Sequence, residues 1–154
     1  DHVDMAPPAE VLLFSAARAQ IVHEVIRPRL ERGNIVLCDR FADSTLAYQG
    51  YGLGLDLEVL RVVTAFATGG LQPDVTFYLD VSLDEGLRRK AGCDPAEWNR
   101  MERRNLSFHE RVAQGYRQLI AAEPARWVVV DAAGDVESIQ GAVRDVLARQ
   151  LAAK

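Results

Sequence analysis

Short apolar runs that alternate with longer helical patterns constrain the fold of this 154-residue chain most strongly. Three of these runs, residues 35–38, 75–81 and 127–130, are rich in β-branched or apolar side chains and lack regular polar alternation. Such runs are typical of parallel strands that helices cover on both faces. The alternation predicts an α/β fold with buried parallel strands and flanking helices.

Helical spacing of apolar residues predicts the other elements. A first helix is expected over residues 9–32, kinked at Pro28 and capped by Gly33. The remaining helices are expected at about 56–68, 83–91, 97–122 and 136–151. No repeat or linker interrupts this pattern, so we expect a single domain over residues 1–154.

Composition excludes several functional classes. The formal charge is −4, from 18 Lys+Arg and 22 Asp+Glu, which gives no general attraction for a nucleic acid polymer. Two cysteines cannot form a disulfide framework or a four-cysteine zinc site. No apolar run approaches the roughly 18 residues of a membrane span, and no signal-peptide layout is present. We expect a cytoplasmic protein that binds neither nucleic acid polymers nor membranes.

The dipeptide Asp39-Arg40 follows the first expected strand, at the end where open α/β sheets collect ligands. The guanidinium of Arg40 offers a planar set of donors for phosphate. The carboxylate of Asp39 can hold that guanidinium, orient a metal-bound water or accept a proton. An ion pair that ties a loop to the sheet would explain the same dipeptide.

Hydrogen-bonding side chains crowd the next residues, with Ser44, Thr45, Tyr48 and Gln49 followed by glycines at 50, 52 and 54. This crowding suits a planar polar ligand, with the glycines loosening the backbone. A polar helix start, capped by Asp43 or Ser44, is the alternative.

Phe14 and Arg18 lie one turn apart on the apolar stripe of the first helix. An arginine on such a stripe needs an anion or carbonyl partner if it is buried, and Phe14 could stack on a base. Alternatively, Arg18 extends to the rim and Phe14 is ordinary core.

A third feature is a basic segment, in which six cations fall within seventeen residues. They are Arg88, Arg89, Lys90, Arg100, Arg103 and Arg104. The segment could contact a polyphosphate by folding over it, although a solvated helical face is the commoner meaning of such a run.

Three stretches together resemble the bacterial thymidylate kinase family. AEVLLFSAARAQIVHEVIRPRLERGNIVLCDRFADSTLAYQGYGLGLD resembles its first nucleotide-binding helix, Asp-Arg-aromatic motif and thymidylate loop. QPDVTFYLDV resembles the following strand, and NRMERRNLSFHERV resembles the arginine-bearing lid. The resemblance implies a P-loop NTPase-like parallel sheet with flanking helices. It also implies transfer of the γ-phosphoryl group of ATP to dTMP, with Mg²⁺ and no tightly bound cofactor.

The resemblance implies roles for residues that match the family's motifs. Phe14 would stack on thymine, and Arg18 would reach the base carbonyl or the phosphate. Asp39 would organise Mg²⁺ through water, and Arg40 would bind the acceptor phosphate. The thymine edge would be surrounded by Ser44, Thr45 and Gln49, and Tyr48 would lie against the deoxyribose. In a lid-like segment, residues 88–107, Arg100 would stabilise charge on the transferred group; the lid residues are Arg100, Glu102 and Arg104.

One departure from the family is large, because no G-x-x-x-x-G-K-[ST] sequence occurs in the 154 residues. In the family this P-loop follows a strand between the two that match residues 35–38 and 75–81. Buried backbone groups without a partner cost about 1–3 kcal/mol each. We therefore expect these residues to be the C-terminal portion of a nucleoside monophosphate kinase fold, missing its N-terminal strand and P-loop and inactive alone.

Two other functions remain open at this point. One is a non-catalytic remnant that binds thymidylate, and the other is a different nucleoside or nucleotide kinase of the same fold. The family dimerises through its long helices, and the apolar first helix permits a homodimer here. Burial within one molecule would produce the same stripe.

Overall fold

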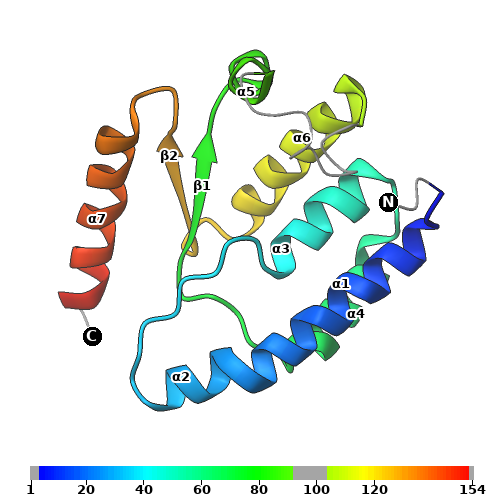
Figure 1. Ribbon diagram of the computed structural model, residues 1–154, viewed down its shortest axis with the longest axis horizontal. Coiled ribbons are helices and arrows are strands. Elements are labelled where there is room, and N and C mark those ends of the chain that lie inside the picture. Colours follow the sequence, from blue (N-terminus) through cyan, green and yellow to red (C-terminus); the bar gives the residue numbers. More distant parts are fainter. Residues whose placement is uncertain (1–3, 92–103, 153–154) are drawn as a thin grey trace. The chain divides into compact units, whose positions relative to one another are not determined.

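The computed structural model describes residues 4–91 and 104–152. The elements are α1 (Pro7–Ile21), the π-helix η1 (Val22–Ile26), α2 (Arg27–Glu31), α3 (Ala42–Thr45), the π-helix η2 (Leu46–Gly52), α4 (Leu57–Thr68), β1 (Thr76–Asp80), α5 (Leu83–Ala91), α6 (Leu106–Ala122), β2 (Trp127–Asp131) and α7 (Val136–Ala152) (Figure 1). They form two compact units: the first contains residues 1–72 and 100–121, and the second contains 73–99 and 122–154.

The expected first helix is confirmed as the continuous run of α1, η1 and α2. Proline at position 28 has no N–H for the carbonyl four residues earlier. The helix widens into its π-helical segment directly before that proline, where the Arg27 N–H donates to the Val22 carbonyl. Gly33 closes the run with φ of 75°, while its N–H and that of Asn34 donate to the carbonyls of Leu30 and Arg29.

Side-chain and glycine caps set the bounds of the later helices. The Asp56 carboxylate accepts the Glu58 N–H at 2.8 Å, and Gly69, with φ of 58°, ends α4. α6 begins later than expected, because residues 104 and 105 are not helical and the Asn105 side chain accepts the Phe108 N–H at 3.0 Å. Residues 97–103 of that predicted helix lie outside the described residues.

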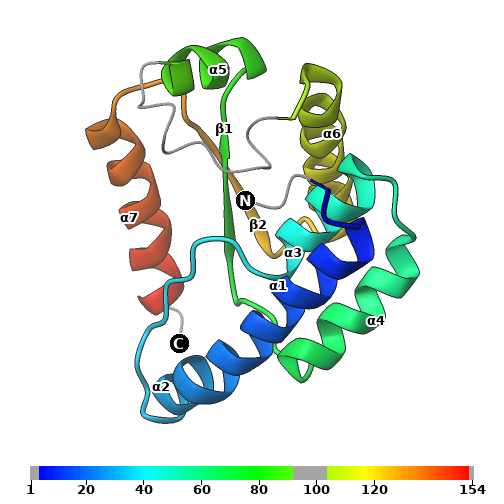
Figure 2. The ribbon, with the colours of Figure 1, turned by 45° about the vertical axis from the view of Figure 1, so that its right-hand side comes forward.

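A parallel pair of strands forms the sheet of the second unit (Figure 2). Thr76 lies opposite Trp127, and Asp80 lies opposite Asp131. This pairing confirms the α/β prediction. The expectation that both strand faces are buried is wrong, because the side chains of Leu79 and Val129 are exposed. In the described residues each strand has only one strand neighbour, which leaves more of its surface open.

Residues 35–38 do not form the expected buried strand. They are extended without a sheet partner in the described part of the chain, and the side chains of Ile35 and Leu37 are 63% and 80% exposed. A strand is stabilised by hydrogen bonds to a neighbour and by packing on its faces. An apolar run alone supplies neither of these.

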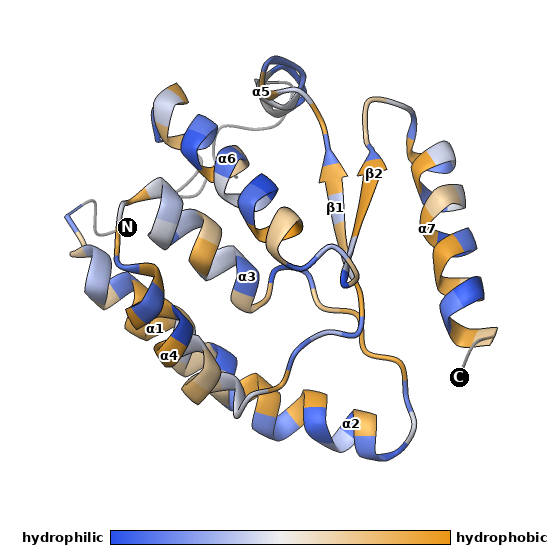
Figure 3. Cartoon of the chain, turned by 180° about the vertical axis from the view of Figure 1, so that it is seen from behind, coloured by the Kyte–Doolittle hydropathy of each residue, from blue (hydrophilic) through white to orange (hydrophobic). Residues whose placement is uncertain are grey.

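The core of the first unit is formed by α1, η1, η2, α4 and α6. Its buried apolar side chains include Val11, Val22, Ile26, Leu46, Ala47, Leu60, Phe108, Val112 and Leu119. In the second unit α7 contacts β2, and it carries alternating hydrophobic and hydrophilic bands (Figure 3). No helix among the described residues is both long and apolar enough to cross a membrane.

Candidate functional site

Two helical segments of the first unit bring most of the predicted site residues together. One is α1, and the other is the continuous segment of α3 and η2. The Arg18 guanidinium donates to the Thr45 hydroxyl at 3.0 Å, and the Gln49 amide donates to the Glu10 carboxylate at 2.7 Å. Arg18 follows Glu10 in α1, whereas its partner Thr45 precedes Gln49 in the second segment. The two segments therefore run antiparallel here.

Arg18 is the central cation of this arrangement. Its guanidinium carbon lies 5.9 Å from the centroid of the Phe41 ring, and Nη2 donates to Thr45. Nη1 is buried without a hydrogen-bond partner among the described residues. Burial lowers the pKa of Arg18, although the nearby Cys38 and Asp43 raise it. A buried donor without a partner is costly, so this group favours a carbonyl or an anion from a ligand.

The ring of Phe14 occupies the turn of α1 between Glu10 and Arg18. Phe14 is 48% exposed, so the alternative that it is ordinary core is wrong. Residues four apart on a helix lie on the same side. An aromatic surface therefore lies on the side of α1 that also carries an acid and a cation.

Residues 42–52 are helical, as the alternative interpretation of this segment predicted. The cap is different, because Phe41 precedes the helix and makes no side-chain cap bond, so neither Asp43 nor Ser44 is the cap. Gly50 and Gly52 do not loosen this segment, whereas Gly54 follows it with φ of 76°. A Cβ at Gly52 would lie 2.6 Å from the Phe108 ring, and one at Gly50 would overlap Leu57, so these positions permit close packing.

Aromatic rings hold Ser44 and Tyr48 in place. The Ser44 and Tyr116 hydroxyls are hydrogen-bonded at 3.1 Å. The Tyr48 ring meets the Tyr116 and Phe108 rings edge to face, with centroids 6.3 and 6.1 Å apart. Burial raises the pKa of Tyr116 to about 12, so its hydroxyl stays protonated at neutral pH. α6 thereby positions the second segment through neutral hydrogen bonds and ring contacts.

Arg40 has φ of 59°, in the left-handed region. Outside glycine this conformation is uncommon, and it is found at functional sites more often than elsewhere. The side chain is exposed, and its guanidinium carbon lies 5.1 Å from the centroid of the Tyr48 ring. No ion pair joins Arg40 to Asp39 or to another described residue, so the alternative of a simple Asp–Arg tie receives no support here.

Asp39 is the predicted residue for organising Mg²⁺ through water. It is exposed, and it shares no group of three or more His, Cys, Asp or Glu side chains that could hold a metal within the described residues. A single carboxylate is compatible with Mg²⁺, because this ion commonly keeps several waters and takes only one or two protein carboxylates.

The basic segment divides between described and undescribed residues. Arg100 and Glu102 lie outside the described residues, as does most of segment 88–107. Arg104 is described, and its guanidinium carbon lies 5.7 Å from the centroid of the Phe108 ring.

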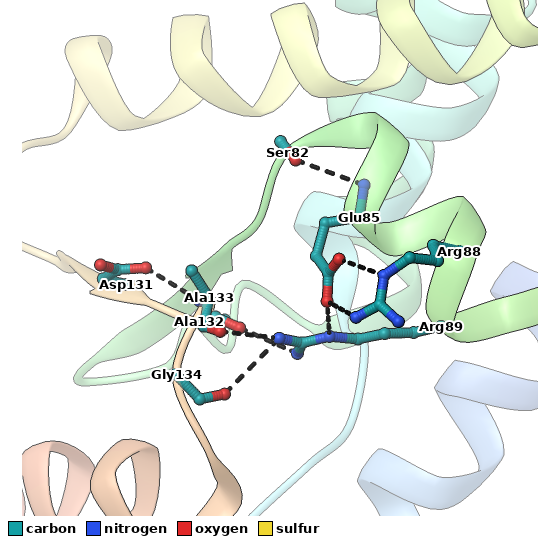
Figure 4. Close-up of polar contacts among 8 residues, drawn as sticks. All are labelled: Ser82, Glu85, Arg88, Arg89, Asp131, Ala132, Ala133 and Gly134. Carbon is teal, nitrogen blue, oxygen red and sulfur yellow. Dashed lines mark hydrogen bonds and ion pairs between the residues drawn. The ribbon is translucent and has the colours of Figure 1, made fainter.

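Arg88 and Arg89 belong to the second unit, where both are bound by Glu85 (Figure 4). The Arg89 guanidinium also donates at 2.9 Å to the carbonyls of Ala132 and Ala133, at the turn between β2 and α7. Hydrogen bonds from Arg88 and Arg89 lower the pKa of Glu85 to about 2. These contacts give the two arginines a structural role within this unit.

Sequence reasoning missed Glu10 and Tyr116, which contact predicted site residues. Glu10 is buried although it is acidic, and it lies four residues before Phe14 on the helical stripe that also carries Arg18. That spacing was a signal in the sequence. Tyr116 is 72 residues from Ser44, so no local pattern connects the two.

Comparison with known proteins gives one consistent result. A sequence model described as thymidylate kinase matches residues 1–143. The thymidylate kinase of Roseiflexus sp. (strain RS-1) is 62% identical over 148 residues, which cover 90% of this chain and 66% of that relative. The thymidylate kinase of Roseiflexus castenholzii is 55% identical over 162 residues (98% and 71%), and that of Herpetosiphon aurantiacus is 49% identical over 158 residues (88% and 67%). The chain thus spans about two thirds of the length of these relatives.

Proposed function

The chain belongs to the thymidylate kinase family, and on this premise we propose that the protein transfers the γ-phosphoryl group of ATP to dTMP, giving dTDP. The 154 residues supply the site for the acceptor nucleotide. The observation that carries this assignment is the buried Nη1 of Arg18, which lacks a partner among the described residues and lies one helical turn from an exposed aromatic ring. A flat base with an exocyclic carbonyl fits both groups.

At the base end, Phe14 stacks on the pyrimidine and Arg18 donates to its carbonyl oxygen. Thr45 holds the guanidinium in place through the bond to Nη2. Gln49 and Ser44 complete the edge of the base, and Tyr48 lies against the deoxyribose. A neighbouring side chain already contacts each of the polar groups, which are Arg18, Ser44, Tyr48 and Gln49, so little of their side-chain entropy is lost on binding.

At the phosphate end, Arg40 binds the acceptor phosphate. Its left-handed backbone and its contact with Tyr48 limit the directions in which the guanidinium extends. In the lid, whose residues include Arg100, Glu102 and Arg104, Arg100 stabilises charge on the transferred group. Phosphoryl transfer depends mainly on positioning and charge stabilisation, for which arginines are well suited.

ATP is the co-substrate, and Asp39 is the residue that would hold Mg²⁺, through water. Bound Mg²⁺ neutralises charge on the phosphate oxygens. The 154 residues contain no P-loop sequence, so we expect them to bind dTMP but not to catalyse transfer without that ATP cradle.

Calorimetry tests the acceptor site directly. The 154-residue chain is titrated with dTMP and with thymidine, in parallel with Arg18→Ala and Arg40→Ala variants. We expect dTMP to bind more tightly than thymidine, and we expect Arg40→Ala to remove that difference. Arg18→Ala should weaken both ligands. A chain that binds thymidine as tightly as dTMP would contradict the monophosphate assignment and favour a nucleoside kinase.

The transfer step needs a second assay. The chain is extended at its N-terminus by a strand and P-loop, and ADP formation is followed with dTMP, ATP and Mg²⁺. The extended protein should turn over, and Arg40→Ala in it should not. Tight dTMP binding without transfer in the extended protein would favour a non-catalytic thymidylate-binding protein.

We further propose that the protein is cytoplasmic and forms a homodimer through α1 and α4. These helices contact each other in the first unit (Figure 1). Large apolar side chains remain exposed on both. They are Leu12, Leu13, Val59, Val62 and Phe66. Several exposed large apolar side chains on two neighbouring helices favour an interface with a second copy of the chain.

A further inference from the structure

We propose that Glu10 is a positioning residue that determines which pyrimidine the site accepts, by fixing the orientation of the Gln49 side-chain amide. This inference rests on the proposed function, because it concerns the base of the acceptor nucleotide. It adds a residue of α1 that touches no substrate atom and acts through Gln49.

The two side chains form a buried pair. Glu10 and Gln49 are 2% and 3% exposed, and Nε2 of Gln49 donates to Oε1 of Glu10 at 2.7 Å. An ionised carboxylate accepts hydrogen bonds and donates none, whereas an amide can do both. The Gln49 nitrogen must therefore face Glu10, and its oxygen Oε1 is turned away. Among the described residues no donor binds that oxygen, so it is available as an acceptor.

Arg18 provides the opposite group. Its Nη1 is a buried donor without a partner in the described part of the chain. Nη2 of Arg18 binds Thr45, four residues before Gln49 on the same helical segment, and Phe14 lies between Glu10 and Arg18 on α1. One edge of a base that stacks on Phe14 therefore meets one acceptor, Gln49 Oε1, and one donor, Arg18 Nη1.

These groups match the base edge of thymine, which offers N3–H as a donor beside a carbonyl oxygen as an acceptor. Cytosine presents the reverse, with N3 as an acceptor beside an amino group. With cytosine, the donor Arg18 Nη1 would face the amino group, and the acceptor Gln49 Oε1 would face N3. Neither pair can form a hydrogen bond, so buried polar groups would be left unpaired. Unpaired buried groups are the strongest source of discrimination available to a binding site. A free amide could rotate by 180° and offer Nε2 to cytosine N3. Glu10 prevents that rotation, since it cannot pair with the amide oxygen.

The experiment compares dTMP and dCMP binding by calorimetry on the full 154-residue chain. Glu10→Gln keeps the size of the side chain but supplies both a donor and an acceptor, so it stabilises either orientation of Gln49. We expect the ratio of dTMP to dCMP affinity to fall at least about tenfold. The fall should come largely from tighter dCMP binding, which a merely structural role of Glu10 would not produce.

An exchange variant provides the rescue. In the double variant Glu10→Gln with Gln49→Glu, the amide on α1 donates to the carboxylate on η2, and the second carboxylate oxygen accepts from thymine N3–H. We expect the preference for dTMP to return to within about threefold of the parent. Ser15→Ala is the matched control, because Ser15 is also buried on α1 and its hydroxyl lacks a partner among the described residues. It should leave the ratio unchanged.

Urea unfolding of each variant checks that the fold is retained. An unchanged ratio in a folded Glu10→Gln variant would overturn the inference, and so would a failure of the exchange variant to restore the ratio. Those results leave the proposed function intact, because the parent chain still prefers dTMP. Failure of the parent chain to bind dTMP would instead contradict the proposed function, and this inference with it.

Discussion

Arg40 is placed by its backbone as much as by its side chain, since φ of 59° is the left-handed conformation that glycine adopts without strain. We expect Arg40→Gly to have a higher free energy of unfolding than Arg40→Ala, by roughly 0.5–1 kcal/mol. Both variants should lose dTMP affinity at least about tenfold, because both lose the charged donors. Urea unfolding and calorimetry measure the two effects. Equal stability of the two variants would contradict the left-handed conformation.

Tyr116 gives the first unit a dependence on alkaline pH. Burial raises the pKa of Tyr116 to about 12. The protonated phenol therefore stabilises the fold fully at pH values below about 10, the ordinary pKa of a tyrosine, and this contribution is lost as the pH rises toward 12. We expect Tyr116→Phe to cost about 1 kcal/mol at pH 8, through loss of the bond to Ser44, and to flatten the alkaline decline. Unfolding by urea at pH 8 to 11 measures both effects.

Ser44→Ala is the control for that prediction. It removes the same hydrogen bond but leaves the buried phenol, so the stability at pH 8 should fall while the alkaline decline remains. A steep decline that persists in Tyr116→Phe would assign it to another group.

At the scale of elements, two helical glycines should respond in opposite directions to alanine. A Cβ at Gly115 in α6 would lie 2.6 to 2.7 Å from the Tyr51 ring, whereas one at Gly141 in α7 would have nothing within 4 Å. We expect Gly115→Ala to destabilise the protein by about 1–3 kcal/mol through overpacking. Gly141→Ala should stabilise it by roughly 0.5–1 kcal/mol, because alanine is the better helix former. Thermal unfolding distinguishes the two; destabilisation by both would contradict the open surroundings of Gly141.

α5 should depend on acidic pH, because the pKa of Glu85 is lowered to about 2 by Arg88 and Arg89. This pairing stabilises the folded state at pH values above about 4.5, the ordinary pKa of a glutamate side chain. The stabilisation is lost as the pH falls toward 2. Glu85→Gln should therefore lower the melting temperature at pH 7 and have a much smaller effect near pH 2. Asp84→Asn is the control, since it removes an equal charge that has no ion pair within the described residues. An equal loss in both variants would assign the effect to net charge.

At the scale of the whole molecule, the exposed apolar side chains of α1 and α4 bear on the state of assembly. Phe66 is 89% exposed, and Val62 lies four residues before it on the same helix. We expect sedimentation to show a dimer and Phe66→Glu to shift it to a monomer, because a charge would be buried at the interface. Phe66→Leu keeps an apolar surface and should remain dimeric. A parent chain that sediments as a monomer at all concentrations would contradict the proposed homodimer.

Local patterns in the sequence determined most of the helices and much of the chemistry. Apolar spacing and caps predicted the first helix with Pro28 and Gly33, because both act within a few residues of the chain. The resemblance of the Asp39-Arg40 and Ser44-to-Gln49 motifs identified the family that the comparisons show. The side-chain types at those positions follow from the sequence alone.

Tertiary structure decided which groups pair across long separations. The apolar run at 35–38 did not become a strand, because a strand depends on a neighbour that no local pattern specifies. Phe14 is exposed although it belongs to an apolar stripe, and Glu10 is buried although it is acidic. The packing of α1 against the segment of α3 and η2 determines the burial of both side chains. The bonds of Gln49 to Glu10 and of Tyr116 to Ser44 join residues 39 and 72 positions apart. Contacts of this range form only when the chain folds, so they alone decide which way each donor and acceptor faces.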